Sequence, residues 1–132
     1  MTGYEISDLL ASNRELISAT WNYFLSVHLA LFGVIFIVSG RARRFERVVL
    51  IAAYVGFMFL NYAAQIENYD IYCRIVDQIA SMPNDAIGGA QAKALVPLGQ
   101  PWVMDWLAPI YASAAGSSAI IIMLINRRKL DG

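Results

Sequence analysis

The chain has 132 residues, enough for one domain, and 58% of them are hydrophobic where about 45–50% is usual. Ten basic and ten acidic side chains cancel, so no overall field draws the protein toward nucleic acid. Three long stretches of the chain contain none of these charged residues. This distribution argues against a soluble enzyme, a disordered tail and a disulfide-held secreted domain.

The N-terminal 16 residues combine two capping-box spacings with a short apolar stripe. Thr2 and Glu5, and again Ser12 and Glu15, stand three residues apart, as the two partners at a helix start do. We expect a short amphipathic helix over residues 4–11, lying along the outer face of the membrane. A new helix, the first span, is expected to begin after the second box.

Three stretches without Asp, Glu, Lys or Arg occupy residues 17–40, 48–66 and 106–126. As helices they would rise about 28–36 Å, against about 30 Å for the hydrocarbon core of a bilayer. We therefore predict an all-α integral membrane protein, a single membrane domain over residues 1–132 with three transmembrane helices. A cleaved signal peptide is the alternative for the first stretch, but the region before it is acidic and the apolar run is too long.

The first span carries a stripe of mostly small residues. Small side chains let helices approach closely, and Asn or Ser can bond across them, so the stripe predicts a packing face. Packing among the three helices of one chain is its simplest use. The stripe falls within about 80° of a helical wheel and consists of Asn22, Ser26, Ala30, Gly33, Ile37 and Gly40.

His28, the only histidine, lies near the centre of the first span and away from that stripe. An ionisable side chain inside a membrane is a functional candidate by default. Three interpretations stay open. The imidazole is neutral and bonded to another helix, or it faces a pore or binds protons, or it ligates a metal or haem with a second ligand from Met58 or another subunit.

A basic cluster follows the first span, and the C-terminal tail is basic too, whereas residues 1–16 and 67–105 carry net negative charge. Because Lys and Arg accumulate in cytoplasmic loops, the pattern predicts an outside N-terminus and a cytoplasmic C-terminus in the inner (cytoplasmic) membrane. The cluster also suits anionic lipid headgroups, although topology alone explains it. It consists of Arg41, Arg43, Arg44 and Arg47.

The second span is expected inside one long helix over about residues 46–82, which leaves the membrane near residue 66 and opens the extracytoplasmic segment 67–105. Gly56 lies on its small-residue face, opposite a polar stripe. Asn61 of that stripe falls at the same depth as Asn22, and we expect the two side chains to face each other. The stripe consists of Arg47, Tyr54, Met58, Asn61, Gln65 and Asn68.

Turn residues at 83–84 and 88–89 end the long helix, and a short helix is expected over residues 90–96. Cys73 is the only cysteine, which rules out a disulfide within the chain. We expect a buried free thiol, with an intermolecular disulfide as the alternative.

The third span contains eight small residues in a row, 112–119, so neighbouring helices can approach it on every side. We predict that Gly116 lies in a helix–helix contact. At least one of Ser113, Ser117 and Ser118 is expected to face another subunit or a polar cavity.

The sequence contains no glycine-rich nucleotide loop, no paired carboxylates at catalytic spacing and no Ser/His/Asp arrangement. We therefore predict no enzymatic activity, no cofactor and no metal site. The candidate polar intramembrane or pore residues are Asn22, His28, Asn61, Gln65, Ser113 and Ser117.

Residues 4–66 begin Tyr-Glu-Ile and continue into a first span reading Trp-Asn-Tyr-Phe-Leu-Ser-Val-His-Leu-Ala-Leu-Phe-Gly, a basic turn and a long second helix. In these features the chain resembles small three-span proteins of the bacterial inner membrane, a resemblance that implies no activity. The topology is also similar to that of phage holins, from which the long segment 67–105 departs.

Two functions are expected from these patterns. The first is a non-catalytic small integral membrane subunit that packs into a larger membrane complex or oligomer. The second is a homo-oligomeric pore or channel-like effector, lined by Asn61 and Gln65 or by the serines of the third span. A redox or enzymatic subunit is a third alternative. The expected partners are the lipid bilayer and other membrane subunits or copies of the chain, and no nucleic acid.

Overall fold

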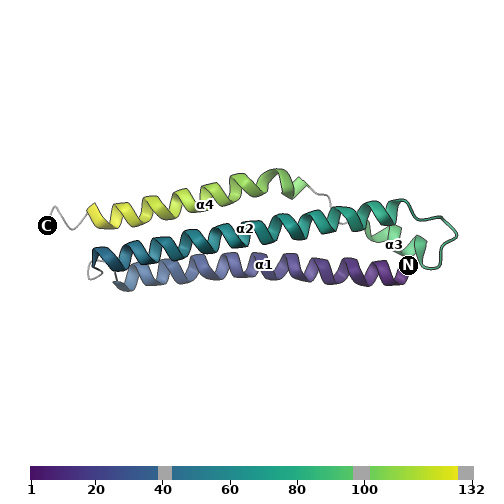
Figure 1. Ribbon diagram of the computed structural model, residues 1–132, viewed down its shortest axis with the longest axis horizontal. Helices are drawn as coiled ribbons and strands as arrows, with labels where there is room; N and C mark the ends of the chain where they lie inside the picture. The colour runs from purple at the N-terminus through teal and green to yellow at the C-terminus, as the bar shows by residue number, and fades with distance from the viewer. Residues whose placement is uncertain (39–42, 97–101, 128–132) are drawn as a thin grey trace. The chain divides into compact units, whose positions relative to one another are not determined.

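The computed structural model describes residues 1–38, 43–96 and 102–127, and these residues are almost entirely α-helical (Figure 1). None of them lies in a β-strand. The all-α prediction is therefore confirmed for the described residues. The helices in chain order are α1 (Gly3–Val38), α2 (Arg44–Ala80), α3 (Gly89–Leu95) and α4 (Trp102–Arg127).

The start of α1 is the capping box that the sequence predicts. The Thr2 backbone N–H donates to Glu5 Oε2 at 2.6 Å, and the Glu5 N–H donates to Thr2 Oγ1 at 3.3 Å. Each side chain thus satisfies a backbone donor that the first helical turn leaves without a partner.

The predicted break between residue 11 and the first span is wrong, because α1 continues without interruption to Val38. No proline or glycine lies between Gly3 and Gly33 to end the helix. Asn13, next to the unused second box, is buried, and its Nδ2 donates to the backbone oxygen of Asn68 at 3.1 Å. That contact holds α1 against α2 at the point where the helix was expected to restart.

The later helices match their predictions closely. The long helix expected over residues 46–82 is α2, and the short helix expected over residues 90–96 is α3. The expected third span lies inside α4, which begins a turn earlier and runs through Pro109 as one helix.

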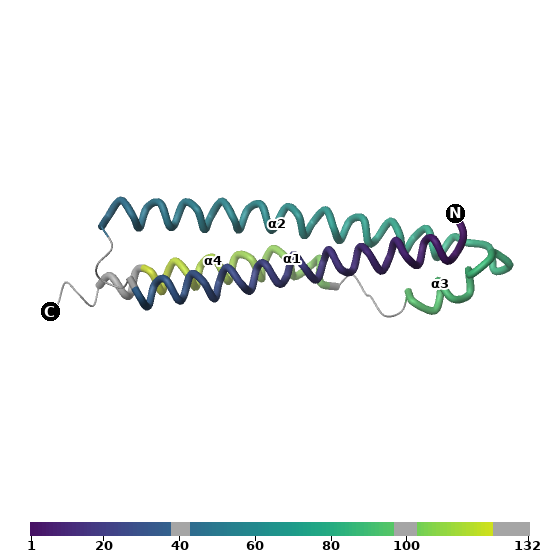
Figure 2. Tube along the Cα trace, turned by 90° about the horizontal axis from the view of Figure 1, so that it is seen from below, coloured from purple at the N-terminus to yellow at the C-terminus, as the bar shows by residue number. Residues whose placement is uncertain are grey.

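The chain divides into two compact units, and α1, α2 and α4 each contribute to both. Unit 1 contains residues 1–21 and 64–106, and unit 2 contains residues 22–63 and 107–132, so far as these are described. In unit 1, α3 lies beside the beginning of α1 (Figure 2). The division falls close to the predicted boundary between membrane and outer segment on α2.

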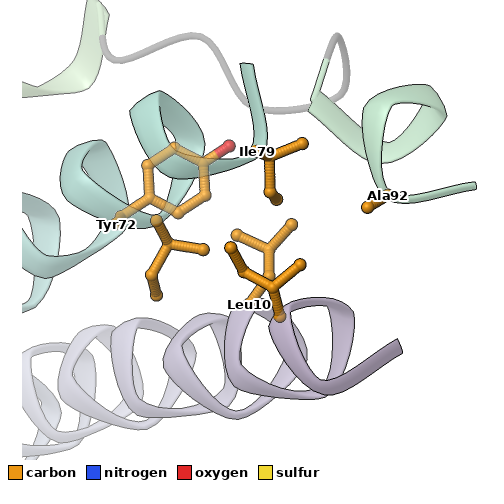
Figure 3. Close-up of a cluster of buried hydrophobic side chains, with 6 residues drawn as sticks. Leu10, Tyr72, Ile79 and Ala92 are labelled. Carbon is orange, nitrogen blue, oxygen red and sulfur yellow. The ribbon is translucent and has the colours of Figure 1, made fainter. Parts of the chain in front are cut away.

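Unit 1 is held by an apolar cluster between α1, α2 and α3 (Figure 3). The apolar stripe that continues along α2 beyond residue 66 supplies half of it, since residues three and four apart share a helix face. Ile6 and Ile79 are completely buried. The members are Ile6, Leu10, Tyr72, Ile75, Ile79 and Ala92.

Two further contacts close the end of unit 1. The Gly3 N–H donates to Ile87 O at 2.7 Å, next to Gly88, whose φ of 74° is in the region that favours glycine. Arg14 Nη2 donates to Leu95 O at 3.1 Å. These bonds join α1 to both ends of the segment that contains α3.

Unit 2 packs parts of α1, α2 and α4 together, and the polar stripe predicted on α2 is the face that becomes buried. Tyr54, Met58 and Asn61 of that stripe are all buried. The face of α1 that packs in unit 2 differs from the prediction: Asn22, Ser26 and Ala30 are exposed. Larger side chains fill the space between the helices instead, namely Phe24, Leu31 and Ile35.

Candidate functional site

A hydrogen bond inside unit 2 joins His28 of α1 to Tyr54 of α2. His28 Nε2 lies 2.8 Å from Tyr54 Oη, and Nδ1 lies 2.6 Å from the backbone oxygen of Phe24, one turn earlier in α1. Tyr54 is buried and His28 is half-buried. Both ring nitrogens therefore have a partner.

These partners fix where the imidazole carries its hydrogen. A carbonyl oxygen can only accept, so the hydrogen is on Nδ1 and is donated to Phe24 O. In the neutral ring Nε2 is then an acceptor, and the Tyr54 hydroxyl donates to it. Of the three interpretations of His28 left open by the sequence, this geometry matches an imidazole bonded to another helix.

The Tyr54 hydroxyl also reaches α4. Tyr54 Oη lies 3.1 Å from Ser118 Oγ and 3.5 Å from Ala114 O. The Tyr54 hydroxyl has one hydrogen, which it can donate to only one of its three neighbours at a time: His28 Nε2, Ser118 Oγ or Ala114 O. His28, Tyr54 and Ser118 form a hydrogen-bonded chain across three helices, which we call the His–Tyr–Ser chain.

A second buried polar contact links α2 and α4. The Tyr111 hydroxyl donates to Asn61 Oδ1, and both residues are buried. The Phe24 ring lies between the two polar contacts, with its centroid 4.3 Å from that of His28 and 4.8 Å from that of Tyr111. Tilted ring pairs of this kind add packing energy to the polar bonds.

The His–Tyr–Ser chain supplies groups that donate and accept hydrogen bonds. The uncharged stretches that supply its residues contain no carboxylate to act as a general base. Across the described part of the chain, no three His, Cys, Asp or Glu residues come together as metal ligands.

Unit 1 has its own polar layer between α1 and α2. Asn68 Nδ2 donates to Thr20 Oγ1 at 3.2 Å, and Trp21 Nε1 donates to Tyr69 Oη at 3.2 Å. Gln65 is completely buried, and neither of its amide atoms has a partner among the described residues. Such a group costs stability unless something outside the described chain satisfies it.

The candidate polar residues are separated by the structure. Asn61 and Gln65 are buried, whereas Asn22, Ser113 and Ser117 are exposed. The predicted contact between Asn22 and Asn61 is wrong, because Asn61 faces Tyr111 and Asn22 faces outward. Helical wheels place residues on faces, but they do not give the rotation of one helix against the next.

The glycines singled out for close packing have open surroundings. A Cβ added to Gly33, Gly56 or Gly116 would meet no other side chain or helix of the described chain within 4 Å. None of the three is therefore a close helix–helix contact within the described part of the chain. Their contact with another chain stays a prediction.

The basic cluster is described only in part. Arg43 and Arg44 are exposed, and the Arg43 N–H donates to Glu46 Oε2 at 2.8 Å at the start of α2. Arg47 is half-buried. Arg41, like Gly40 of the α1 stripe, lies outside the described residues.

Cys73 of unit 1 is a free, half-buried thiol. Its Sγ lies 3.7 Å from Met104 Sδ. Burial raises the pKa of the Cys73 thiol, and the negative charges of Asp77 and Asp70 raise it further. The group therefore stays protonated at neutral pH, which is the unreactive form of cysteine.

Sequence reasoning found His28 but missed Tyr54 and Ser118 as its hydrogen-bonded neighbours, and it missed Tyr111 as the partner of Asn61. Tyr54 shares a helix face with Asn61, so its place in the polar stripe was a usable signal. Ser118 carried no separate signal, because the serines of α4 look alike until the burial of each is known.

Comparison of the chain with protein-family models, curated proteins and solved structures finds no match.

Proposed function

We propose that the chain is a small, non-catalytic integral membrane subunit that packs against other membrane helices. The support for a membrane location is that α1 and α2 are long and apolar enough to cross a bilayer. In each, only 22% of the most apolar window is buried. A core helix of a soluble protein would be mostly buried, whereas here residues such as Phe36 and Ile37 are 77% and 83% exposed.

The observation that carries the packing role is the exposed face of α4. Ser113, Gly116 and Ser117 are three and four residues apart, all exposed, with open space at Gly116. In a bilayer no hydrophobic force drives helices together, so association depends on close backbone approach and on interhelical hydrogen bonds. A face with a glycine and two hydroxyls supplies both, and it covers lipid poorly.

The proposal includes α4 as a third span, with the N-terminus outside and the C-terminus in the cytoplasm of the inner membrane. The uncharged stretch 106–126 supports the span, and the basic cluster at 41–47 with the basic tail supports the orientation. The acidic segments 1–16 and 67–105 then lie together on the outer side.

The test of the packing role is Gly116→Leu, with Ala53→Leu as control because Ala53 is an exposed small residue on α2. Leucine favours insertion at either site, so both variants are expected in the membrane. We expect Gly116→Leu to lose its partners or copies, measured as the mass of the detergent-purified complex by light scattering, while Ala53→Leu keeps them. An unchanged mass for Gly116→Leu would contradict the proposal.

A homo-oligomeric pore is the second candidate, and the shared exposed face of Ser113 and Ser117 is the observation that favours it. A lining by Asn61 and Gln65 loses support, since both are buried within the chain. A ring of identical chains that conducts ions in liposomes would favour the pore. Other subunits in the purified complex would favour the first proposal.

A further inference from the structure

We propose that the side-chain amide of Gln65 binds a water molecule in the polar layer of unit 1. The proposal goes beyond the assembly role and does not depend on it. Gln65 is 0% exposed, and neither its Nε2 nor its Oε1 has a hydrogen-bond partner in the described part of the chain. A buried donor and acceptor left in that condition cost stability, so the amide calls for a ligand that can reach it.

Gln65 lies on the face of α2 that packs against α1. Asn68 and Tyr69, three and four residues farther along α2, share this face. Both contact α1, since Asn68 Nδ2 donates to Thr20 Oγ1 and Trp21 Nε1 donates to Tyr69 Oη, each at 3.2 Å. The Gln65 amide is one helical turn from these two bonds and takes part in neither.

The ligand must both donate and accept hydrogen bonds, because the amide carries two N–H hydrogens and an acceptor oxygen. A cation would satisfy only the oxygen, and an anion only the nitrogen. The stretch 48–66 contains no Asp, Glu, Lys or Arg, and Glu67, which follows it, is exposed. Because Gln65 is fully enclosed, the ligand must also be small. Water meets both conditions, and a buried water typically makes about three hydrogen bonds.

Tyr69 supplies the third of these bonds. Its hydroxyl oxygen accepts from Trp21 Nε1, which leaves the hydroxyl hydrogen to be donated elsewhere. Long side chains of a helix lean toward the preceding turn, which for Tyr69 is the turn of Gln65. The water accepts from Gln65 Nε2–H and from the Tyr69 hydroxyl, and it donates to Gln65 Oε1. One water can bridge both atoms of the amide, because the oxygen and one N–H of a primary amide point to the same side.

The position of the site predicts how the water exchanges. Gln65 is next to the last residue of the uncharged stretch 48–66, so water reaches it from the aqueous outer end of the expected span. Its side chain is closed off from the surface, so the water can leave only when α1 and α2 separate locally. The bound water should therefore stay far longer than water on the protein surface.

Solution NMR of the labelled full chain in detergent micelles tests the site. The side-chain NH₂ signal of Gln65 is assigned by its loss in Gln65→Met. Nuclear and rotating-frame Overhauser effects from water to this NH₂ group should have opposite signs, which is the signature of a long-lived bound water. Gln78, an exposed glutamine on the same helix, is the control and should show effects of the same sign. The same pattern at Gln65 as at Gln78, or no effect from water at all, would overturn the proposal.

A hydroxyl hydrogen that exchanges with water could imitate the signal, and Tyr69→Phe removes that hydroxyl on the neighbouring turn. The effect at Gln65 should weaken, because the water loses one of three bonds, but it should persist. Tyr23→Phe, at an exposed tyrosine of α1, should leave the effect unchanged. Complete loss of the effect in Tyr69→Phe would show that it came from the hydroxyl and would overturn the water site. An effect of unaltered size would overturn the bond from Tyr69.

Discussion

Gly3 is the residue at which the beginning of α1 meets the turn before α3. A Cβ on Gly3 would lie 2.2 Å from the backbone carbon of Gly88 and 2.6 Å from the backbone nitrogen of Gly89. These are backbone atoms, which cannot swing aside as the end of a side chain can. Gly3 therefore allows a close approach of two chain segments, whereas Gly33, farther along the same helix, has open space around it.

The two glycines give a matched pair of substitutions. Gly3→Ala should lower the thermal unfolding midpoint in detergent, because the turn must move away and weaken the bond from Gly3 N–H to Ile87 O. Gly33→Ala should leave the midpoint unchanged or raise it, since alanine is favoured over glycine in a helix by up to about 1 kcal/mol. Equal responses at the two positions would show that the contact at Gly3 does not matter for stability.

At the scale of the element, α1 contains two capping-box spacings. Thr2 and Glu5 form the hydrogen bonds of a capping box, whereas Ser12 and Glu15 lie inside the helix. The hydrogen bond from the Thr2 backbone lowers the pKa of Glu5 below its ordinary value. A carboxylate with a lowered pKa in the folded state contributes stability above its ordinary pKa. That contribution disappears as the pH falls through the lowered value.

Replacing the first residue of each box by alanine should therefore change the stability of the protein differently. At neutral pH Thr2→Ala should destabilise the start of α1 by about 1 kcal/mol, the usual effect of removing an N-cap. As the pH falls through the lowered pKa of Glu5, the difference should become smaller, because the Thr2 side chain is one of the groups that lower this pKa. Ser12→Ala should have no such effect at either pH, because Ser12 lies inside the helix. Thermal unfolding followed by circular dichroism, at neutral and at acidic pH, measures the stability of the unaltered chain and of both variants.

The positions of the helices along the chain were largely predictable from the sequence, and their rotation was not. Apolar runs, the Thr2–Glu5 box and the turn residues at 83–89 place α2 and α3 to within two residues. The continuity of α1 was missed because a capping-box spacing occurs inside helices as well as at their ends. The contact between Asn13 and Asn68 holds α1 against α2 at this point, and it depends on a helix distant in sequence.

In the candidate site, too, the sequence marked individual residues but did not predict which of them come into contact. His28 stood out because it is the only ionisable side chain in an uncharged stretch, and the buried face of α2 was marked by its polar stripe. Its contact with Tyr54, and the contact of Asn61 with Tyr111, needed the registers of α2 against α1 and α4. Small residues misled the prediction for α1, since they can face a partner chain as readily as a neighbour in the same chain.

At the scale of the whole molecule, the proposed function includes an orientation with the N-terminus outside and the C-terminus in the cytoplasm. A reporter that is active only in the cytoplasm should work when fused after Gly132 and should fail when inserted at Asp85. Asp85 is an exposed residue in the turn between α2 and α3, so an insertion there interrupts no helix. Activity at Asp85 and none after Gly132 would invert the assignment of every polar segment to a side.

The contact between Arg14 and the carbonyl of Leu95 spans 81 residues of sequence, and it has a consequence for the order of events during synthesis. A ribosome finishes the beginning of α1 long before it makes Tyr72, Ile79 or Ala92, the residues that cover Ile6 and Leu10. The first turns of α1 therefore stay uncovered until the end of α2 and α3 have been made. Contacts between distant residues form late because the loop between them must first be closed. Unit 1 can thus become protected from proteases only after Leu95 has been made, and unit 2 only later, because it needs the residues of α4 that follow Trp106.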